Sequence, residues 1–330
     1  MIWLRGMAIV AGLLLAVTGV GAIALGQLLA FPVSPPPPLE SIRAGALAID
    51  RSGMPDLSHF QARDGSLLAY RAYPAANGDR QNIAILIHGS GGHSTVMNGI
   101  AKRLAAENIL VIVPDERGHG ASGTRGDIGY YGQLDDDLDD LIGELRRQYL
   151  TGHFALLGFS SGGGFALRAA VGNQSAAFRR LILLSPYLGY DAPSTRRPSD
   201  APTWANPDIP RLIALSLLHR LDLRCCEALP VIAFAVSPGS EKYVTSRYSY
   251  RLLTNFGAPT DLNTAFRLLK LPTTIISGGA DELMVPDKYA DVVRGIEPAI
   301  DIRIVPGLSH MDMLHAPTAI DAVAAAFKEK

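Results

Sequence analysis

The chain contains a series of short apolar segments, rich in β-branched residues and separated by helical stretches. Their apolarity is continuous rather than alternating, which is typical of strands buried on both faces of a parallel sheet. They cover residues 82–89, 109–115, 154–160, 180–186, 273–279 and 301–307. Strands that alternate with helices predict a doubly wound α/β fold, whose ligands bind beyond the carboxyl ends of the strands. We therefore expect functional residues directly after these segments.

Three further features complete the predicted organisation. Residues 59–74 turn at Asp64-Gly65 and predict a β-hairpin before the parallel strands. Leucines at helical spacing predict a helix over 134–149, whose acidic run at 135–140 is expected to be a solvated face. The interval between Pro186 and Thr273 is too long for a loop, so we expect an inserted helical cap at about 187–271.

The N-terminal region differs from the rest of the chain. No charged residue occurs between Gly6 and Leu39, and residues 1–33 predict a transmembrane anchor, because the apolar run could cross about 30 Å of hydrocarbon. The alternative is a cleaved signal peptide and a secreted protein. In either case we expect residues 58–330, the globular domain, on the outer side of the membrane, after a proline-rich linker at 34–57.

Composition limits the classes of partner. The chain has 330 residues, a net charge of -1 and 48% apolar residues, so a broad basic surface for nucleic acid is not expected. Cys225 and Cys226 are adjacent, which excludes a disulfide framework and a zinc site of four thiolates, and their role is not predicted. His88 and His93 have no third ligand at suitable spacing. We expect no metal, and the sequence does not determine the oligomeric state.

The segment Gly158-Phe159-Ser160-Ser161-Gly162 follows one predicted strand and begins a helix. It matches G-x-S-x-G, in which glycines allow a tight turn around a serine nucleophile. Only Ser160 has glycine both two residues before and two residues after it, so Ser160 is the predicted nucleophile. A plain helix N-cap would explain the serine equally well if the motif stood alone.

Two later positions supply the partners that a serine nucleophile needs. Asp281 follows the segment at 273–279, and His310 follows the segment at 301–307. The order serine, acid, histidine is that of a nucleophile, an orienting carboxylate and a general base on this kind of sheet. Competing candidates lie close by: Glu282, Asp287 and Asp312 as acids and His315 as base.

Backbone donors for an oxyanion are expected at two places. His88-Gly89-Ser90-Gly91-Gly92 follows the first buried strand, where such a donor is required, and we predict the N–H of Ser90. The second donor is the N–H of Ser161 at the start of the helix. Residues 115–120, although rich in charge, are expected to form an internal hydrogen-bonded brace.

The chain resembles the α/β-hydrolase superfamily, in particular the serine lysophospholipases, monoacylglycerol lipases and S33 aminopeptidase-like proteins. The resemblance depends on HGSGG, DERGHGASG, GFSSG, GGADELMVP and GLSHMD in this order, and covers residues 58–330 apart from the cap. It implies an eight-stranded, mostly parallel sheet, no cofactor, and Ser160, Asp281 and His310 as nucleophile, acid and base. The cap and the N-terminal apolar segment depart from the pattern.

These observations predict a serine hydrolase that cleaves a carboxylic ester through an acyl-enzyme. A membrane tether beside an apolar cap favours a small-molecule or lipid-like acyl substrate. Acyl transfer, thioester cleavage and peptide hydrolysis would use the same three residues. A membrane-tethered binding protein without chemistry is the alternative of a different class.

Overall fold

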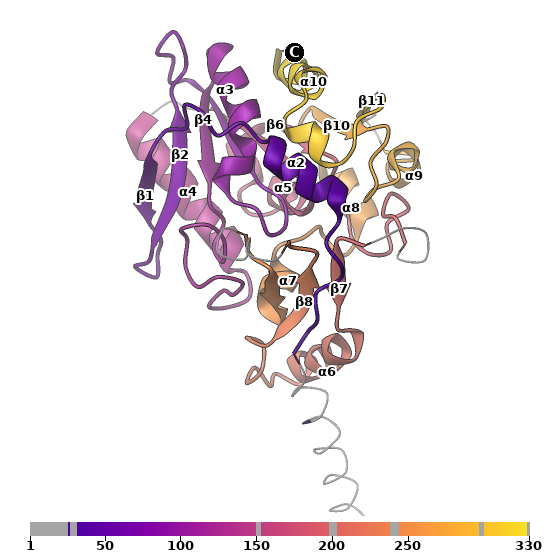
Figure 1. The fold of residues 1–330 in the computed structure, drawn as a ribbon. Helices are drawn as coiled ribbons and strands as arrows, with labels where there is room; N and C mark the ends of the chain where they lie inside the picture. Colours follow the sequence, from indigo (N-terminus) through magenta and orange to yellow (C-terminus); the bar gives the residue numbers. More distant parts are fainter. Residues whose placement is uncertain are drawn as a thin grey trace, which may run out of the picture.

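The computed structural model describes residue 26 and residues 32–149, 153–197, 203–237, 244–296 and 300–328. Within these residues an eight-stranded sheet runs in the order β1-β2-β4-β3-β5-β6-β10-β11 (Figure 1). Its strands are β1 (Leu57–Gln61), β2 (Leu67–Tyr73), β3 (Asn82–Ile87), β4 (Leu110–Pro114), β5 (His153–Phe159), β6 (Phe178–Leu184), β10 (Thr273–Gly278) and β11 (Asp301–Val305). Strand β2 pairs antiparallel with β1 and β4, and the other pairs are parallel. The predicted sheet and hairpin are confirmed.

Helices cover both faces of the sheet. On β3, Ile83, Ile85 and Ile87 belong to one apolar cluster, while Ala84 and Leu86 belong to another. The first cluster includes side chains of α4 (Gln133–Tyr149) and α5 (Ser161–Val171). The second includes side chains of α3 (Asn98–Ala106) and α10 (Pro317–Lys328). Burial on both faces explains why these strands are apolar at consecutive positions.

The insertion between β6 and β10 is not purely helical. It contains α6 (Ile209–Arg220), α7 (Tyr250–Asn255) and α8 (Leu262–Leu268), and also an antiparallel sheet of β7 (Ala205–Pro207), β8 (Pro230–Phe234) and β9 (Arg247–Ser249). The prediction of a helical cap was therefore incomplete. Val231 to Ala235 are buried, and this continuous apolar run was the signal of a strand that we missed. Figure 1 shows β7, β8, α6 and α7 together at one end of the large sheet.

Part of the segment expected as a linker at 34–57 is packed on the domain. It contains α2 (Glu40–Ala48), whose residue Gly45 contacts Met311 so closely that a Cβ there would overlap the methionine side chain. Just before the segment, Arg247 Nε donates to the carbonyl of Val33 at 3.2 Å, and at its first residue Asn206 Nδ2 donates to the carbonyl of Ser34 at 3.0 Å. The segment thus joins the cap to the main domain.

The predicted anchor at 1–33 lies, apart from residues 26, 32 and 33, outside the described residues. Over the described ranges, none of the helices has the length and apolarity to cross a bilayer.

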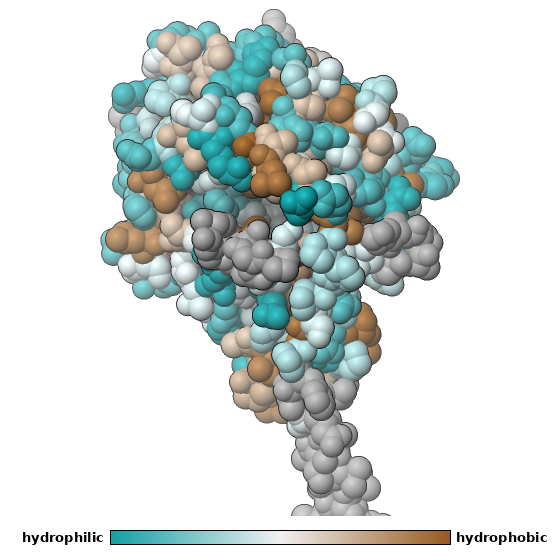
Figure 2. Space-filling view, viewed as in Figure 1, coloured by the Kyte–Doolittle hydropathy of each residue, from teal (hydrophilic) through white to brown (hydrophobic). Residues whose placement is uncertain are grey.

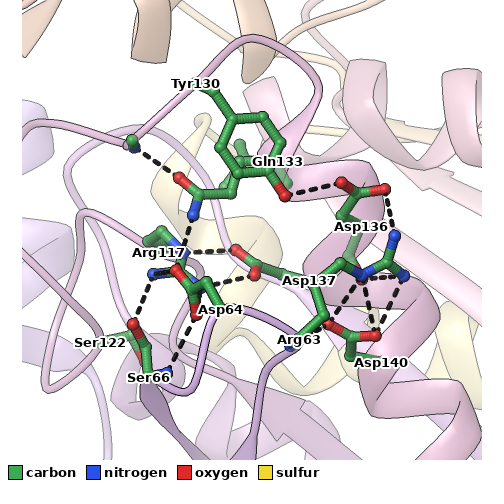
Figure 3. A network of polar contacts seen from close by, with 12 residues as sticks. Arg63, Asp64, Ser66, Arg117, Ser122, Tyr130, Gln133, Asp136, Asp137 and Asp140 are labelled. Carbon is green, nitrogen blue, oxygen red and sulfur yellow. Dashed lines mark hydrogen bonds and ion pairs between the residues drawn. The ribbon is translucent and has the colours of Figure 1, made fainter.

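The acidic run on α4 is only in part the expected solvated face, because Asp139 is exposed whereas Asp137 is not. Asp137 is buried and forms an ion pair with Arg117 at 2.7 Å, and Arg117 also pairs with Asp64 of the hairpin turn (Figure 3). Arg63 bonds to Asp136 and Asp140 on the same helix face. The sequence suggested solvation because the arginine partners are distant along the chain and give no local signal. The run therefore fastens the hairpin to α4.

Candidate active site

Ser160 occupies a strained turn between β5 and α5. Its φ of 54° and ψ of -122° are uncommon for a residue with a side chain, and its N–H donates to Leu184 O at 3.0 Å. Ser161 is the first residue of α5, so its N–H has no acceptor one helical turn earlier. The positive end of the helix dipole lies at this point. The turn therefore places a hydroxyl beside an unused backbone donor, as the G-x-S-x-G motif predicts.

The glycines of the motif are required by close backbone approach. A Cβ at Gly162 would overlap the carbonyl of His88 at the end of β3, and a Cβ at Gly158 would overlap the carbonyl of Gly162. Gly163 also has no room for a side chain, because a Cβ there would lie 2.8 Å from Pro186 Cβ. Small residues thus allow α5 to begin directly against the neighbouring strand ends.

Asp281 and His310 form a buried pair at the carboxyl ends of β10 and β11. Asp281 Oδ2 lies 2.8 Å from His310 Nδ1, and Asp281 Oδ1 accepts the N–H groups of Leu283 and Met284 at 2.9 Å each. Both side chains are almost fully buried. With Nδ1–H donating to the carboxylate, Nε2 of His310 carries the free lone pair that a general base needs.

The electrostatics of this pair favour proton acceptance by His310. Burial alone would lower the pKa of His310, but the carboxylates of Asp281 and Glu282 outweigh it and raise this pKa above its ordinary value. For Asp281, burial opposes ionisation, yet His310 and the backbone donors keep the pKa of the carboxyl below its ordinary value. A carboxylate that stays ionised stabilises an imidazolium formed during a reaction.

The ring of His310 contacts the ring of Phe159, the residue before Ser160. The rings of Phe159 and His310 are 4.8 Å apart between centroids, and Phe159 immediately precedes Ser160. Among the described residues, the Ser160 hydroxyl makes no hydrogen bond to the His310 ring. Such bonds often tighten only when substrate is bound. The structure therefore gathers the three predicted residues at one edge of the sheet.

The competing acids Glu282 and Asp312 bind other groups, and Asp287 is exposed. Glu282 Oε2 accepts the backbone N–H of His310 at 2.9 Å, so its hydrogen bond is to the loop backbone, and it acts on the ring only through its charge. Asp312 accepts the N–H and hydroxyl of Ser309, at 2.8 and 2.6 Å, and lies 3.4 Å from His315. Asp287 is exposed and belongs to a 3₁₀ turn, η3 (Pro286–Lys288). Between acid and base the chain forms this turn and the short helix α9 (Tyr289–Val292).

The loop of residues 88–92 lies against the serine turn. A Cβ at Gly89 would lie 3.1 Å from Ser160 Cβ, which places Ser90 next to the predicted nucleophile. Gly92 N–H donates to Gly89 O at 3.1 Å, and Gly91 has a φ of +72°, which favours glycine. The indole N–H of Trp204 donates to Ser90 Oγ at 2.8 Å. Trp204 is not among the predicted site residues, because nothing in its local sequence indicates that the cap reaches this loop.

The polar residues that surround the loop are structural. His88 Nδ1 bonds to Gly89 O at 2.8 Å, its Nε2 accepts the N–H of Glu116 at 3.1 Å, and burial lowers its pKa to about 4. Asp115 accepts the N–H groups of Ser94 and Ala121. The predicted brace at 115–120 is confirmed. Over the described ranges, no three His, Cys, Asp or Glu side chains gather as metal ligands.

Residues 78–315 match the family model of serine aminopeptidases, S33. The chain belongs to this family. Its large sheet is that of an α/β hydrolase, and the structure of a soluble variant of monoglyceride lipase from Saccharomyces cerevisiae has a TM-score of 0.63 at 17% identity. That similarity covers 89% of this chain and 97% of the yeast chain.

Two curated relatives of this S33 member are, like the yeast protein, named as lipases of monoglycerides. The human monoglyceride lipase is 30% identical over 134 residues, which is 40% of this chain and 44% of the human protein. The monoacylglycerol lipase of Mycolicibacterium smegmatis is 26% identical over 241 residues, 70% of this chain and 82% of that protein. The chain thus spans less than half of the human relative. The resemblance to the monoacylglycerol lipase branch is confirmed.

Proposed function

We propose that this S33 family member is a serine hydrolase that cleaves a carboxylic ester through an acyl-enzyme intermediate. The observation that carries the proposal is the strained Ser160 turn, with the Asp281–His310 pair packed beside it. Ser160 attacks the carbonyl carbon while Nε2 of His310 takes its proton. His310 then returns the proton to the leaving alcohol, and water activated by the same nitrogen releases the acid.

The oxyanion would be bound by two backbone donors. The N–H of Ser161 lies at the start of α5, and Ser90 belongs to the loop that contacts Ser160. Each donor in such a site typically contributes about 2.7–4 kcal/mol to transition-state stabilisation. Buried surroundings strengthen both interactions.

We further propose a monoacylglycerol or a similar lipid ester as the substrate class. The named relatives are monoglyceride lipases, and the cap carries an exposed apolar stripe on α6. Ile213 and Leu217 on this helix and its C-cap residue Leu221 are 57%, 56% and 70% exposed, at a spacing of four residues. Figure 2 shows apolar side chains on the lower lobe, where Figure 1 places α6.

We propose that residues 1–33 anchor the protein in a membrane, with the domain on the outer side. Val33 and Ser34 lie beside the cap, because their carbonyls accept hydrogen bonds from Arg247 and Asn206. Figure 1 shows α6 on the same lobe as the start of this segment, so an anchor that leaves there would bring the α6 stripe close to the bilayer. Fractionation of the full chain, with protease protection of intact cells, tests both the anchor and its orientation.

The decisive experiment for the chemistry compares Ser160→Ala with Ser161→Ala in the full chain. Ser160→Ala should lose ester hydrolysis by about 10⁴-fold or more, together with covalent labelling by a fluorophosphonate. Ser161→Ala keeps its backbone N–H and should retain both. A panel of monoacylglycerols, short esters, thioesters and aminoacyl amides then identifies the substrate class. Full activity of Ser160→Ala would disprove the proposed mechanism.

A further inference from the structure

The cap binds the loop of residues 88–92 at Ser90 and Gly91. Gly91 N–H donates to the hydroxyl of Tyr248 at 2.7 Å, and Gly91 O accepts the N–H of Thr245 at 2.9 Å. Together with the bond from Trp204 to Ser90 Oγ, three residues of the insertion bind this loop. Both backbone groups of Gly91 are therefore fixed by the cap.

Tyr248 is built into a directional chain of hydrogen bonds. Its hydroxyl accepts from Gly91, so its own proton points to Nε2 of His119, 2.6 Å away. Nδ1 of His119 lies 3.2 Å from the carbonyls of Glu116 and Arg117, and these acceptors require a proton on Nδ1. The donors and acceptors of all three groups are thereby determined.

Burial keeps this chain in its neutral form. Tyr248 and His119 are each 1% exposed, and burial raises the pKa of the Tyr248 phenol while it lowers that of His119. The ring of Tyr248 is held edge-on by Phe234, at 4.7 Å between centroids, and Phe234 stacks on Trp204 at 5.4 Å. A rigid aromatic group of the cap thus supports both contacts to the loop.

We propose that Tyr248, supported by His119, is a positioning residue that holds the Ser90 N–H in place to bind the oxyanion. The inference rests on the proposed ester hydrolysis. Gly91 follows Ser90, so a shift of the Gly91 peptide moves the Ser90 donor relative to Ser160. Such a donor acts only when it is held at the correct distance from the developing charge. The cap therefore contributes to the chemistry as well as to substrate binding.

The test compares Tyr248→Phe with Tyr250→Phe in the full chain. Both substitutions remove one hydroxyl from a buried cap tyrosine, but the hydroxyl of Tyr250 bonds to Ser216 Oγ at 3.2 Å, away from the loop. Tyr248→Phe should lower kcat about tenfold or more with little change in KM. The affinity for a trifluoromethyl ketone, whose adduct carries the oxyanion, should fall by the same factor as kcat/KM. Tyr250→Phe should match the wild type.

The proposal is overturned if Tyr248→Phe keeps the wild-type kcat, or if its loss lies entirely in KM. Should Tyr248→Phe fail to fold, Trp204→Phe decides: it removes the donor to Ser90 Oγ and should also lower kcat and ketone affinity together. Labelling of wild-type Ser160 by a fluorophosphonate distinguishes failure of the positioning role from failure of the proposed ester hydrolysis. If the wild type is labelled and Tyr248→Phe has the wild-type kcat, only the positioning role is refuted. If the wild type is not labelled, both proposals are refuted.

Discussion

The carboxylate of Asp281 lies 2.8 Å from Nδ1 of His310, and both side chains are buried where β10 and β11 end. The opposite oxygen of the carboxylate accepts two backbone N–H groups, so the side chain cannot turn away from the imidazole without losing them. The ring of His310 held in this way lies 4.8 Å, between centroids, from the ring of Phe159, the residue before Ser160.

Asp281→Asn tests the role of this pair. The amide can keep the two backbone bonds, but its NH₂ group facing Nδ1 would favour the wrong imidazole tautomer, so kcat should fall about 10³- to 10⁴-fold. Wild-type activity should rise with pH through the pKa of His310, because only the neutral ring is a base. Without the carboxylate of Asp281, burial dominates and lowers the pKa of His310. The rising limb of the pH–rate profile should therefore move to lower pH. A pH–rate profile of both proteins measures this shift.

Glu282→Gln is the matched control, since this neighbouring carboxylate contacts only the backbone of His310. It should retain most of kcat. An Asp281→Asn variant that is as active as Glu282→Gln would exclude the orienting role.

Gly162→Ala and Gly143→Ala compare two helical glycines. A Cβ at Gly162 would overlap the carbonyl of His88, so the variant should lose about 1–3 kcal/mol of unfolding free energy, together with activity. A Cβ at Gly143 meets only Arg147 Nη1 at 3.7 Å, and alanine there should add about 0.5–1 kcal/mol. Denaturant unfolding measures both. Equal stability of the two variants would contradict the close approach of α5 to β3.

Arg117→Met removes the cation from the buried pair with Asp137. Because an unpaired carboxylate would remain, we expect a loss of about 3–5 kcal/mol of unfolding free energy. Burial already raises the pKa of Asp137 despite the guanidinium, and without it this pKa should rise further. The folded state would then bind the proton more tightly than the unfolded state, so the variant should regain stability as the pH falls.

Glu144→Gln provides the comparison, because its pair with Arg147 lies on the surface. The unfolding free energy of this variant should stay near that of the wild type. If Arg117→Met behaved in the same way, the ion pair in Figure 3 would not be what fastens the hairpin to α4.

The α6 stripe predicts dependence on a lipid surface. Ile213→Asp combined with Leu217→Asp should lower hydrolysis of monoacylglycerol in phosphatidylcholine vesicles about tenfold or more, because apolar contact with the bilayer is lost. Hydrolysis of a soluble p-nitrophenyl ester should not change. Leu268→Asp, at a side chain 55% exposed on α8, is the control and should leave both activities intact. Equal loss with both substrates would refute membrane contact by the stripe.

The sequence by itself determined the large sheet and the positions of Ser160, Asp281 and His310. Strands buried on both faces must be apolar at consecutive positions, and a tight turn between strand and helix needs glycine, so both leave signals within a few residues. The continuous apolar run at 230–236 is the same kind of signal for β8.

Only the tertiary structure decided how the cap and the N-terminal segment pack on the domain of the large sheet. Three contacts join groups that are distant along the chain: the hydrogen bond of Gly91 to Tyr248, that of Trp204 to Ser90, and the ion pair of Arg117 with Asp137. Such contacts depend on where whole elements pack, and a tyrosine or an aspartate has the same local sequence signal whether its partner is water or a buried backbone amide.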